Sequence, residues 1–143
     1  MRALGIDLGL KRIGFAMSDE LGISIKMLPV RNASSRNELM KTIIEMCVEN
    51  NIKEIVIGCP NELSAQSKAI AKRAKGLREE ILKKENLAHI KASLWDESYT
   101  SKTAHKMLLE MSLKRTRRKE LIDSASAAVI LEEFLQARGH QDA

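Results

Sequence analysis

Short apolar runs separated by turn residues occupy the first 30 positions of the chain. Residues 2–8 and 11–18 are predominantly apolar, and the glycine-containing turn at residues 9–11 is typical of a hairpin between two strands. A third extended run covers residues 23–30, where Pro29 favours an edge position because proline cannot donate a backbone hydrogen bond. These three runs predict an antiparallel meander.

The remainder of the chain alternates between helical and strand patterns. Apolar residues recur at intervals of three and four between positions 39 and 47 and again between positions 70 and 81, as in amphipathic helices. The pattern predicts, in order, a helix that Ser34 or Ser35 caps and that ends at Asn50-Asn51, a strand at 53–58, a helix at 65–84, a strand at 90–95, a helix from Thr100 or Ser101 to about Leu109, and a last helix at about 117–137.

The order of these elements predicts an α/β fold in one domain spanning residues 1–143, with about 138–143 as a short tail. No repeat, low-complexity tract or linker divides the sequence. Three leading strands followed by alternating strands and helices predict a mixed sheet with helices on both faces. We expect the first three strands to be antiparallel and the later strands to be parallel, because helical crossovers join the later ones.

Composition narrows the class of protein. Apolar residues make up 44% and charged residues 30% of the 143 residues, which is ordinary for a globular protein and excludes wholesale disorder. The longest apolar stretches are too short to cross a bilayer, and no apolar leader follows Met1. Cys47 and Cys59 form neither a disulfide framework nor a metal-binding spacing. We therefore expect a cytoplasmic protein.

Three acidic residues stand where packing does not explain them. Asp7 ends an apolar strand, Glu97 follows the strand that ends near Trp95, and Asp123 interrupts a helix of small and apolar residues. A carboxylate among buried apolar residues is costly unless it is paired or bound to a metal. Three carboxylates suit Mg²⁺ or Mn²⁺, and a two-metal arrangement of such ions hydrolyses phosphodiesters.

A zinc site, or a purely structural role for Asp123, accounts for the pattern less well. His89, His105 and His140 are scattered and lack the spacing of zinc ligands. Asp123 alone would be explained as an acid near a helix N-terminus, which the helix dipole favours. The small residues around it would let the helix approach a sheet closely, and a helix beside the first strand would carry Asp123 toward Asp7. The three acids together therefore favour a metal site.

Positive charge is concentrated next to Asp123. The net charge is +5, and five of the six residues at 114–119 are cationic. Cations near a helix N-terminus interact unfavourably with the helix dipole, and a phosphate-binding role would account for their presence there. The alternative is that these cations simply lie in solvent at the start of the helix. The expected nucleic-acid-binding residues are Lys11, Arg12, Lys114, Arg115, Arg117, Arg118 and Lys119.

Four motifs, in this order, resemble those of the YqgF (RuvX) family. They are GIDLGLKRIG at residues 5–14, VIGCP at 56–60, DESYTS at 96–101 and RKELID at 118–123. The resemblance covers nearly the whole chain and implies an RNase H-like fold with a five-stranded mixed sheet. The family is described as Holliday junction resolvases and as nucleases that process the 5′ end of pre-16S ribosomal RNA. The match implies that Asp7, Glu97 and Asp123 are the catalytic, metal-binding acids.

The sequence departs from the family pattern at two places. Ser98 stands where the family usually has an arginine, so a cation near the scissile phosphate is missing. The loop at residues 61–66 lacks the glycine that the family usually has there. Both departures concern substrate handling and rate more than fold.

Two other functions fit the pattern. Residues 5–9 also resemble the phosphate loop of actin-type and sugar-kinase phosphotransferases, but those enzymes close two such domains around a nucleotide, and 143 residues hold one. A nucleic-acid-binding module with the same fold and weak or no cleavage is the second alternative, which Ser98 favours. The metal chemistry does not distinguish structured RNA from branched DNA. We expect a monomer or a weak homodimer, with no membrane contact.

Overall fold

A computed structural model of the protein describes residues 1–32, 35–96 and 115–142, apart from the side chains at 115–123 and 139–142. Its elements are β1 (Ala3–Leu8), β2 (Arg12–Ser18), β3 (Ile25–Asn32), α1 (Arg36–Asn50), β4 (Glu54–Cys59), α2 (Ala65–Lys83), the short 3₁₀ helix η1 (Glu85–Leu87), β5 (Lys91–Asp96) and α4 (Arg115–Asp142). The expected elements therefore occur in the expected order. The helix expected at about residues 100–109 lies outside the described residues.

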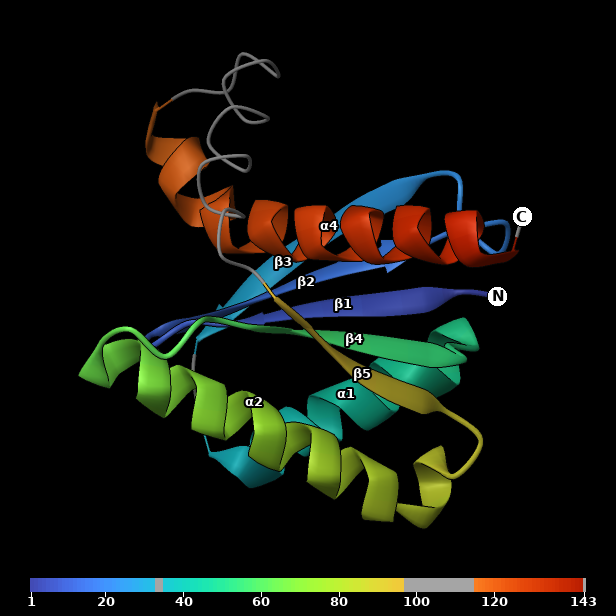
Figure 1. The fold of residues 1–143 in the computed structure, drawn as a ribbon, viewed down its shortest axis with the longest axis horizontal. Coiled ribbons are helices and arrows are strands. Elements are labelled where there is room, and N and C mark those ends of the chain that lie inside the picture. The colour runs from blue at the N-terminus through green and yellow to red at the C-terminus, as the bar shows by residue number, and fades with distance from the viewer. Residues whose placement is uncertain (33–34, 97–114, 143) are drawn as a thin grey trace.

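The five strands form one mixed sheet in the order β3-β2-β1-β4-β5 (Figure 1). β1 pairs antiparallel with β2, and β2 pairs antiparallel with β3. The pairs β1–β4 and β4–β5 are parallel. The meander, the parallel later strands and the edge position of Pro29 are thus confirmed. The carboxyl ends of β1, β4 and β5 meet at one edge of the sheet, which we call the carboxyl edge.

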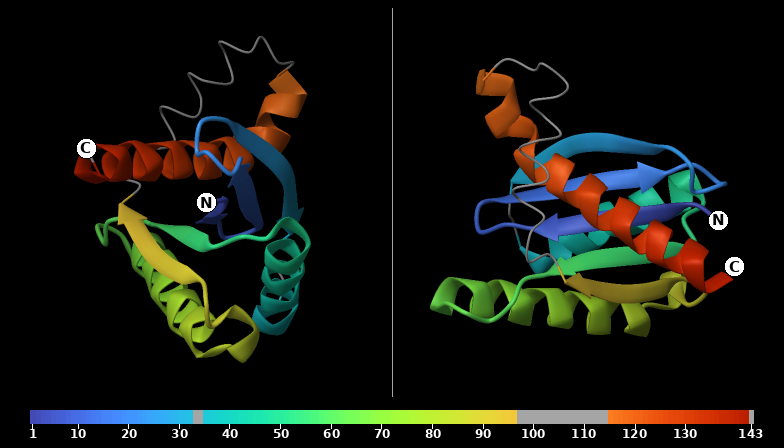
Figure 2. Two further views of the ribbon diagram at one scale, coloured as in Figure 1. Left: turned by 90° about the vertical axis from the view of Figure 1, so that its right-hand side faces the viewer. Right: turned by 45° about the horizontal axis from the view of Figure 1, so that its top comes forward.

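Helices cover both faces of the sheet, as expected (Figure 2). On one face, the α1/α2 face, helices α1 and α2 pack over a core of large aliphatic side chains that includes Ile6 and Ile43. On the other, the α4 face, helix α4 packs against small residues such as Ala3 and Ala16. The sheet therefore separates two cores of different composition.

Polar residues begin and end the helices on the α1/α2 face. Ser35 Oγ accepts a hydrogen bond from Glu38 N at 3.2 Å, and Ser64 Oγ accepts one from Ser67 N at 3.0 Å. Asn51 ends α1 with a φ of 54°, the left-handed conformation that asparagine tolerates better than most residues. The expected start and end of the first helix are confirmed.

Strand β3 lies two residues later than expected, beginning at Ile25 and ending at Asn32. The carboxylate of Asp19 explains the shift. Its Oδ1 accepts a hydrogen bond from Ile23 N at 2.8 Å, and its Oδ2 accepts one from Ser24 Oγ at 3.1 Å. These bonds keep the backbone up to Ser24 in the turn, and the Ile23 N–H in particular holds the pKa of Asp19 below its usual value.

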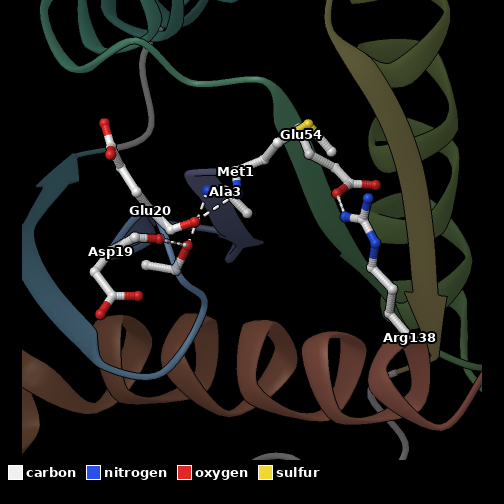
Figure 3. Close-up of polar contacts among 7 residues, drawn as sticks. Met1, Ala3, Asp19, Glu20, Glu54 and Arg138 are labelled. Atoms are coloured by element: carbon white, nitrogen blue, oxygen red, sulfur yellow. Dashed lines mark hydrogen bonds and ion pairs between the residues drawn. The ribbon is translucent and has the colours of Figure 1, made fainter. Parts of the chain in front are cut away.

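Helix α4 is longer than expected at both ends, because it runs Arg115–Asp142 instead of about 117–137. Of the residues expected to form a short tail, 138–142 therefore belong to the helix. Arg138 makes an ion pair with Glu54 at the start of β4 (Figure 3). Glu54 is buried, so its carboxylate requires a partner, and the pair anchors this part of α4 to the sheet. No helix within the described residues is long and apolar enough to cross a membrane.

Candidate active site

Asp7 lies on the central strand β1, one residue before its carboxyl end. Side chains alternate between the two faces of a strand, and Ile6 and Leu8 belong to the core of the α1/α2 face. Ala3 and Gly5 instead pack against α4, so Asp7 shares the α4 face with them. Its side chain is half-buried. In open α/β sheets, ligands bind at the carboxyl ends of the strands, which is where this carboxylate stands.

Glycines surround Asp7 on the α4 face. Gly5 precedes it by two residues on β1, and Gly14 is its register partner on β2. On β4, Gly58 lies two residues after Val56, which packs on the α4 face. None of these positions places a side chain beside the Asp7 carboxylate. Three positions that flank Asp7 on this face of the sheet therefore carry no side chain.

The close approach of α4 to β1 depends on Gly5. A Cβ atom at Gly5 would lie 2.8 Å from Ala127 O and 3.1 Å from Leu131 Cβ, so any larger residue would push the helix away from the strand. The expectation that small residues bring the last helix close to the first strand is therefore confirmed.

Helix α4 crosses the α4 face obliquely and opposite in direction to β1 (Figure 2). Near the C-terminal end of the helix, Arg138 pairs with Glu54, which is the register partner of Ala3 at the start of β1. Closer to its N-terminal end, Ala127 meets Gly5. Followed back toward its N-terminus, α4 therefore approaches the carboxyl edge.

The backbone of Asp123 lies on α4 directly before Ser124. Ser124 Oγ donates a hydrogen bond to Leu28 O on β3, and the sheet register places Leu28 level with Ile6 across β2. This part of α4 therefore lies level with Ile6, the residue directly before Asp7 on β1. The side chain of Asp123 lies outside the described residues.

Strand β5 is tied to α4 just before the position of the third expected acid. Trp95 Nε1 donates a hydrogen bond to Glu133 Oε2 at 3.0 Å, and the Trp95 ring packs edge-on against Phe134 with centroids 5.8 Å apart. Asp96 is exposed and ends the strand at the carboxyl edge. Glu97 is the next residue in the sequence and lies outside the described residues.

The metal site expected from three acids stays a prediction. Within the described residues, no group of three or more histidine, cysteine, aspartate and glutamate side chains could hold a metal ion. Of the expected trio, Asp7 alone has a described side chain. Its chemistry fits, because a carboxylate is an oxygen ligand of the kind that Mg²⁺ and Mn²⁺ prefer.

Two of the expected cations lie on the turn that follows β1. Gly9 N donates a hydrogen bond to Arg12 O at 2.8 Å, and a Cβ atom at Gly9 would lie 2.6 Å from the same oxygen, so the turn requires glycine. Lys11 and Arg12 are exposed at this turn. The structure thus brings both cations to the carboxyl edge beside Asp7.

The side chains of the remaining expected cations lie outside the described part of the chain. Lys114 is not described at all, and Arg115, Arg117, Arg118 and Lys119 have a described backbone only, in the first turns of α4. In Figure 1 this end of α4 and the carboxyl end of β1 lie on the same side of the molecule. Their contact with nucleic acid stays a prediction.

Residues 1–137 match the protein family described as RuvX: Holliday junction resolvase. The chain belongs to the RuvX family. It is 36% identical over 138 residues to "Putative pre-16S rRNA nuclease" of Clostridium botulinum (strain Eklund 17B / Type B), covering 94% of this chain and 96% of that protein. A protein of the same name from Clostridium acetobutylicum is 34% identical over 137 residues, covering 96% of this chain and 99% of the relative.

Solved structures of resolvases share the fold. The T. thermophilus RuvC in complex with a Holliday junction substrate matches with a TM-score of 0.58 and 15% identity, covering 97% of this chain and 96% of that one. The fowlpox virus resolvase in complex with Holliday junction DNA gives a TM-score of 0.60 at 14% identity, covering 96% and 99%. These likenesses confirm the RuvC-like, RNase H-like fold of this RuvX-family chain.

One cation at the carboxyl edge was missed by sequence reasoning. Arg31 on β3 is the register partner of Ile13, which is in turn the partner of Leu8 at the end of β1. It is exposed. Nothing in the sequence around Arg31 distinguishes it from a solvated edge residue, and only the strand order brings it level with the end of β1.

The residues that sequence reasoning set aside are explained by packing and solvent. Cys47 is buried in α1, and burial raises the pKa of its thiol to about 12. Cys59 packs partly against the core of the α1/α2 face, and His89 is exposed. On the basic side of α2, Lys75 pairs with the Glu62 carboxylate, as on an ordinary solvated face.

Proposed function

We propose that this RuvX-family protein is a metal-dependent nuclease that hydrolyses phosphodiester bonds. The observation that carries the proposal is the position of Asp7: a half-buried carboxylate at the carboxyl edge, surrounded by glycines, on the face that α4 covers closely. A carboxylate at this edge supplies oxygen ligands of the kind that Mg²⁺ and Mn²⁺ prefer. The helix that carries Asp123 approaches the same edge.

Asp7, Glu97 and Asp123 are the residues that would hold Mg²⁺ or Mn²⁺. When bound, a pair of such ions activates a water molecule and stabilises the leaving oxygen in phosphodiester hydrolysis. The chain contributes the oxygen ligands and their rigid placement. β1 fixes Asp7 in the centre of the sheet, Trp95 fixes the end of β5 against α4, and Gly5 lets α4 lie close to β1.

The proposed substrates are the 5′ end of pre-16S rRNA, branched DNA, or both, in the cytoplasm. Support comes from the names of the relatives and from the junction DNA bound by the two resolvases of like fold. The cations Lys11 and Arg12 at the turn, with the basic run at 114–119, would hold phosphates that the acids alone would repel. The protein would act as a monomer or a weak homodimer.

A binding module with weak or no cleavage is the second candidate, and the serine at position 98 favours it. The positive charge of an arginine near a scissile phosphate stabilises the negative charge that develops there. A serine has no positive charge and does not provide this stabilisation. The family match favours both candidates over an actin-type phosphotransferase.

Cleavage of a labelled substrate panel tests the proposal. The panel contains a pre-rRNA 5′ fragment, a four-way DNA junction and matched duplexes, each with Mg²⁺, Mn²⁺ or EDTA. The parent should cleave at least one substrate with metal and none in EDTA, and Asp7→Asn should abolish cleavage. Glu45→Gln, which removes an exposed carboxylate on α1, is the control and should leave the rate unchanged. Binding without metal-dependent cleavage on every substrate would select the binding module.

A further inference from the structure

A small cavity lined by two arginines lies next to the carboxyl end of β1, between β1 and the helices α1 and α2. Its volume is about 170 Å³, and its lining residues are Leu8, Arg36, Leu39, Arg73 and Leu77. The leucines belong to the core of the α1/α2 face, so the cavity opens on the side of the sheet opposite to the Asp7 carboxylate. Two guanidinium groups against leucine side chains form an environment that attracts an anion.

Arg36, the first residue of α1, lies over helix α2. Its Nη1 pairs with Glu80 Oε2 at 3.1 Å, and its Nη2 donates to Arg73 O at 3.4 Å. A Cβ atom at Gly76 would lie 3.4 Å from Arg36 Nη2. The glycine in α2 therefore lets the Arg36 guanidinium pack against this helix. Glycine in a helix interior costs about 1 kcal/mol relative to alanine, and this contact accounts for its presence. The charge of Arg36 is matched by Glu80.

Arg73 carries a charge that no carboxylate of the described residues matches. Its Nη1 donates a hydrogen bond to Gly9 O at 2.9 Å, a neutral acceptor in the β1–β2 turn. Its side chain is half-buried beside Leu8 and Leu77. A partly desolvated cation is stabilised by an anion. With Arg36 and Glu80 compensating each other, the cavity has one net positive charge.

The cavity adjoins the candidate active site through the chain itself. Leu8, which lines the cavity, follows Asp7 directly, and Arg73 holds the carbonyl of Gly9 in the next position. Lys11 and Arg12 are exposed on the same turn. The β1–β2 turn therefore connects Asp7 with the carbonyl that Arg73 holds.

We propose that Arg73, with Arg36, binds a phosphate of the nucleic-acid backbone at a position away from the one that is cleaved. The inference rests on the proposed function in one respect, that the ligand is a nucleic acid. One net positive charge in the cavity matches the single negative charge of a phosphodiester. A phosphate monoester carries about 1.5 to 2 negative charges at pH 7 and matches it less well.

Binding measured against salt concentration in EDTA tests this site without any cleavage. Each phosphate contact contributes roughly 0.7 to 0.9 to the slope of log affinity against log salt. Arg73→Gln should lower the slope by that amount and weaken binding about fivefold at 0.15 M salt. Arg73→Lys should keep the slope, because it keeps the charge. Lys72→Gln removes an exposed charge from the neighbouring position on α2 and should leave both slope and affinity unchanged.

Three results would overturn the inference. One is an unchanged slope in Arg73→Gln, and another is an equal loss in Arg73→Lys, which would make Arg73 a support of the turn only. The third is displacement of the oligonucleotide by micromolar inorganic phosphate from the parent but not from Arg73→Gln, which would assign the cavity to a free anion. Circular dichroism checks the folding of each variant.

A second variant keeps the test decisive if Arg73→Gln fails to fold. Arg36→Gln leaves Arg73 opposed by Glu80, so the net positive charge of the cavity disappears and the slope should fall by the same amount. An unchanged slope in Arg36→Gln would also overturn the inference. Failure of the proposed function looks different: the parent would bind with the expected slope but cleave nothing when metal is added.

Discussion

The two faces of the sheet are packed with side chains of different size. Under α1 and α2 the core consists mainly of leucine, isoleucine and phenylalanine side chains. Under α4 it consists largely of alanine, with Gly5 in direct contact with the helix backbone. Large aliphatic side chains bury more apolar area and supply more of the stability. The small ones let a helix that carries an acid come close to the strand that carries Asp7. One face thus stabilises the fold, and the other places the candidate site.

The largest expected effect on stability comes from the α1/α2 face. Ile57→Ala removes a fully buried side chain of β4 and should lower the free energy of unfolding by about 2–5 kcal/mol. Because Ile57 points away from α4, the folded protein should keep its metal-dependent cleavage rate per molecule. Urea unfolding and cleavage below the transition region measure the two quantities. A large loss of rate in the folded state would contradict the division between the faces.

The next effect concerns the ion pair at the far end of α4. Arg138→Met leaves the buried Glu54 carboxylate without this partner. It should lower the free energy of unfolding by about 3 kcal/mol, the lower end of the values seen when one member of a buried ion pair is removed. Glu132→Gln, at an exposed position on the same helix, is the control and should change stability by less than about 0.5 kcal/mol. Equal stabilities of the two variants would show that the pair does not anchor α4.

Gly5→Ala tests the α4 face directly. The added Cβ would lie 2.8 Å from Ala127 O, so α4 must shift, at a cost of roughly 1–3 kcal/mol. Although this cost is smaller than that of Ile57→Ala, the loss of cleavage should be larger, because misplacing a ligand-bearing helix by about 1 Å can reduce a rate a hundredfold. Measuring cleavage at temperatures where both variants are fully folded gives the comparison. A normal rate in Gly5→Ala would show that the close approach is not needed.

The smallest effect comes from the Asp19 side chain in the turn before β3. Asp19 is exposed, and its pKa is depressed chiefly by the Ile23 N–H, so its stabilising contribution is present above the unfolded value of 3.8. That contribution is lost as the pH falls through the lower folded value. The stability difference between the parent and Asp19→Ala should therefore be constant between pH 7 and about pH 5 and shrink below pH 4. A difference that grows on acidification would contradict the hydrogen bonds that Asp19 makes in this turn.

Local patterns predicted most of the fold because apolar periodicity and caps act over a few residues. The helix that Ser35 caps and that ends at Asn51 is one case. The two errors came from polar side-chain interactions that apolar periodicity does not encode. Asp19 extends the turn before β3 through side-chain bonds, and Arg138 lies in a helix end that is joined to Glu54, 84 residues away in sequence.

The candidate site was predictable only in part. Asp7 was found because a charge at the end of an apolar strand is hard to account for by packing, and the small residues of the last helix indicated its approach to β1. The roles of Gly76 and Arg73 depend on how α1 and α2 meet and on a contact with Gly9. No pattern along the chain signals such contacts, because they follow from tertiary packing.

Calorimetric titration with Mn²⁺ tests the central claim, that Asp7, Glu97 and Asp123 form one metal site. The parent should bind the ion, and Asp7→Asn, Glu97→Gln and Asp123→Asn should each abolish that binding, because each removes a ligand of the same site. Glu45→Gln should bind as the parent does. Normal Mn²⁺ binding by Asp123→Asn or Glu97→Gln, with binding lost only in Asp7→Asn, would contradict the account.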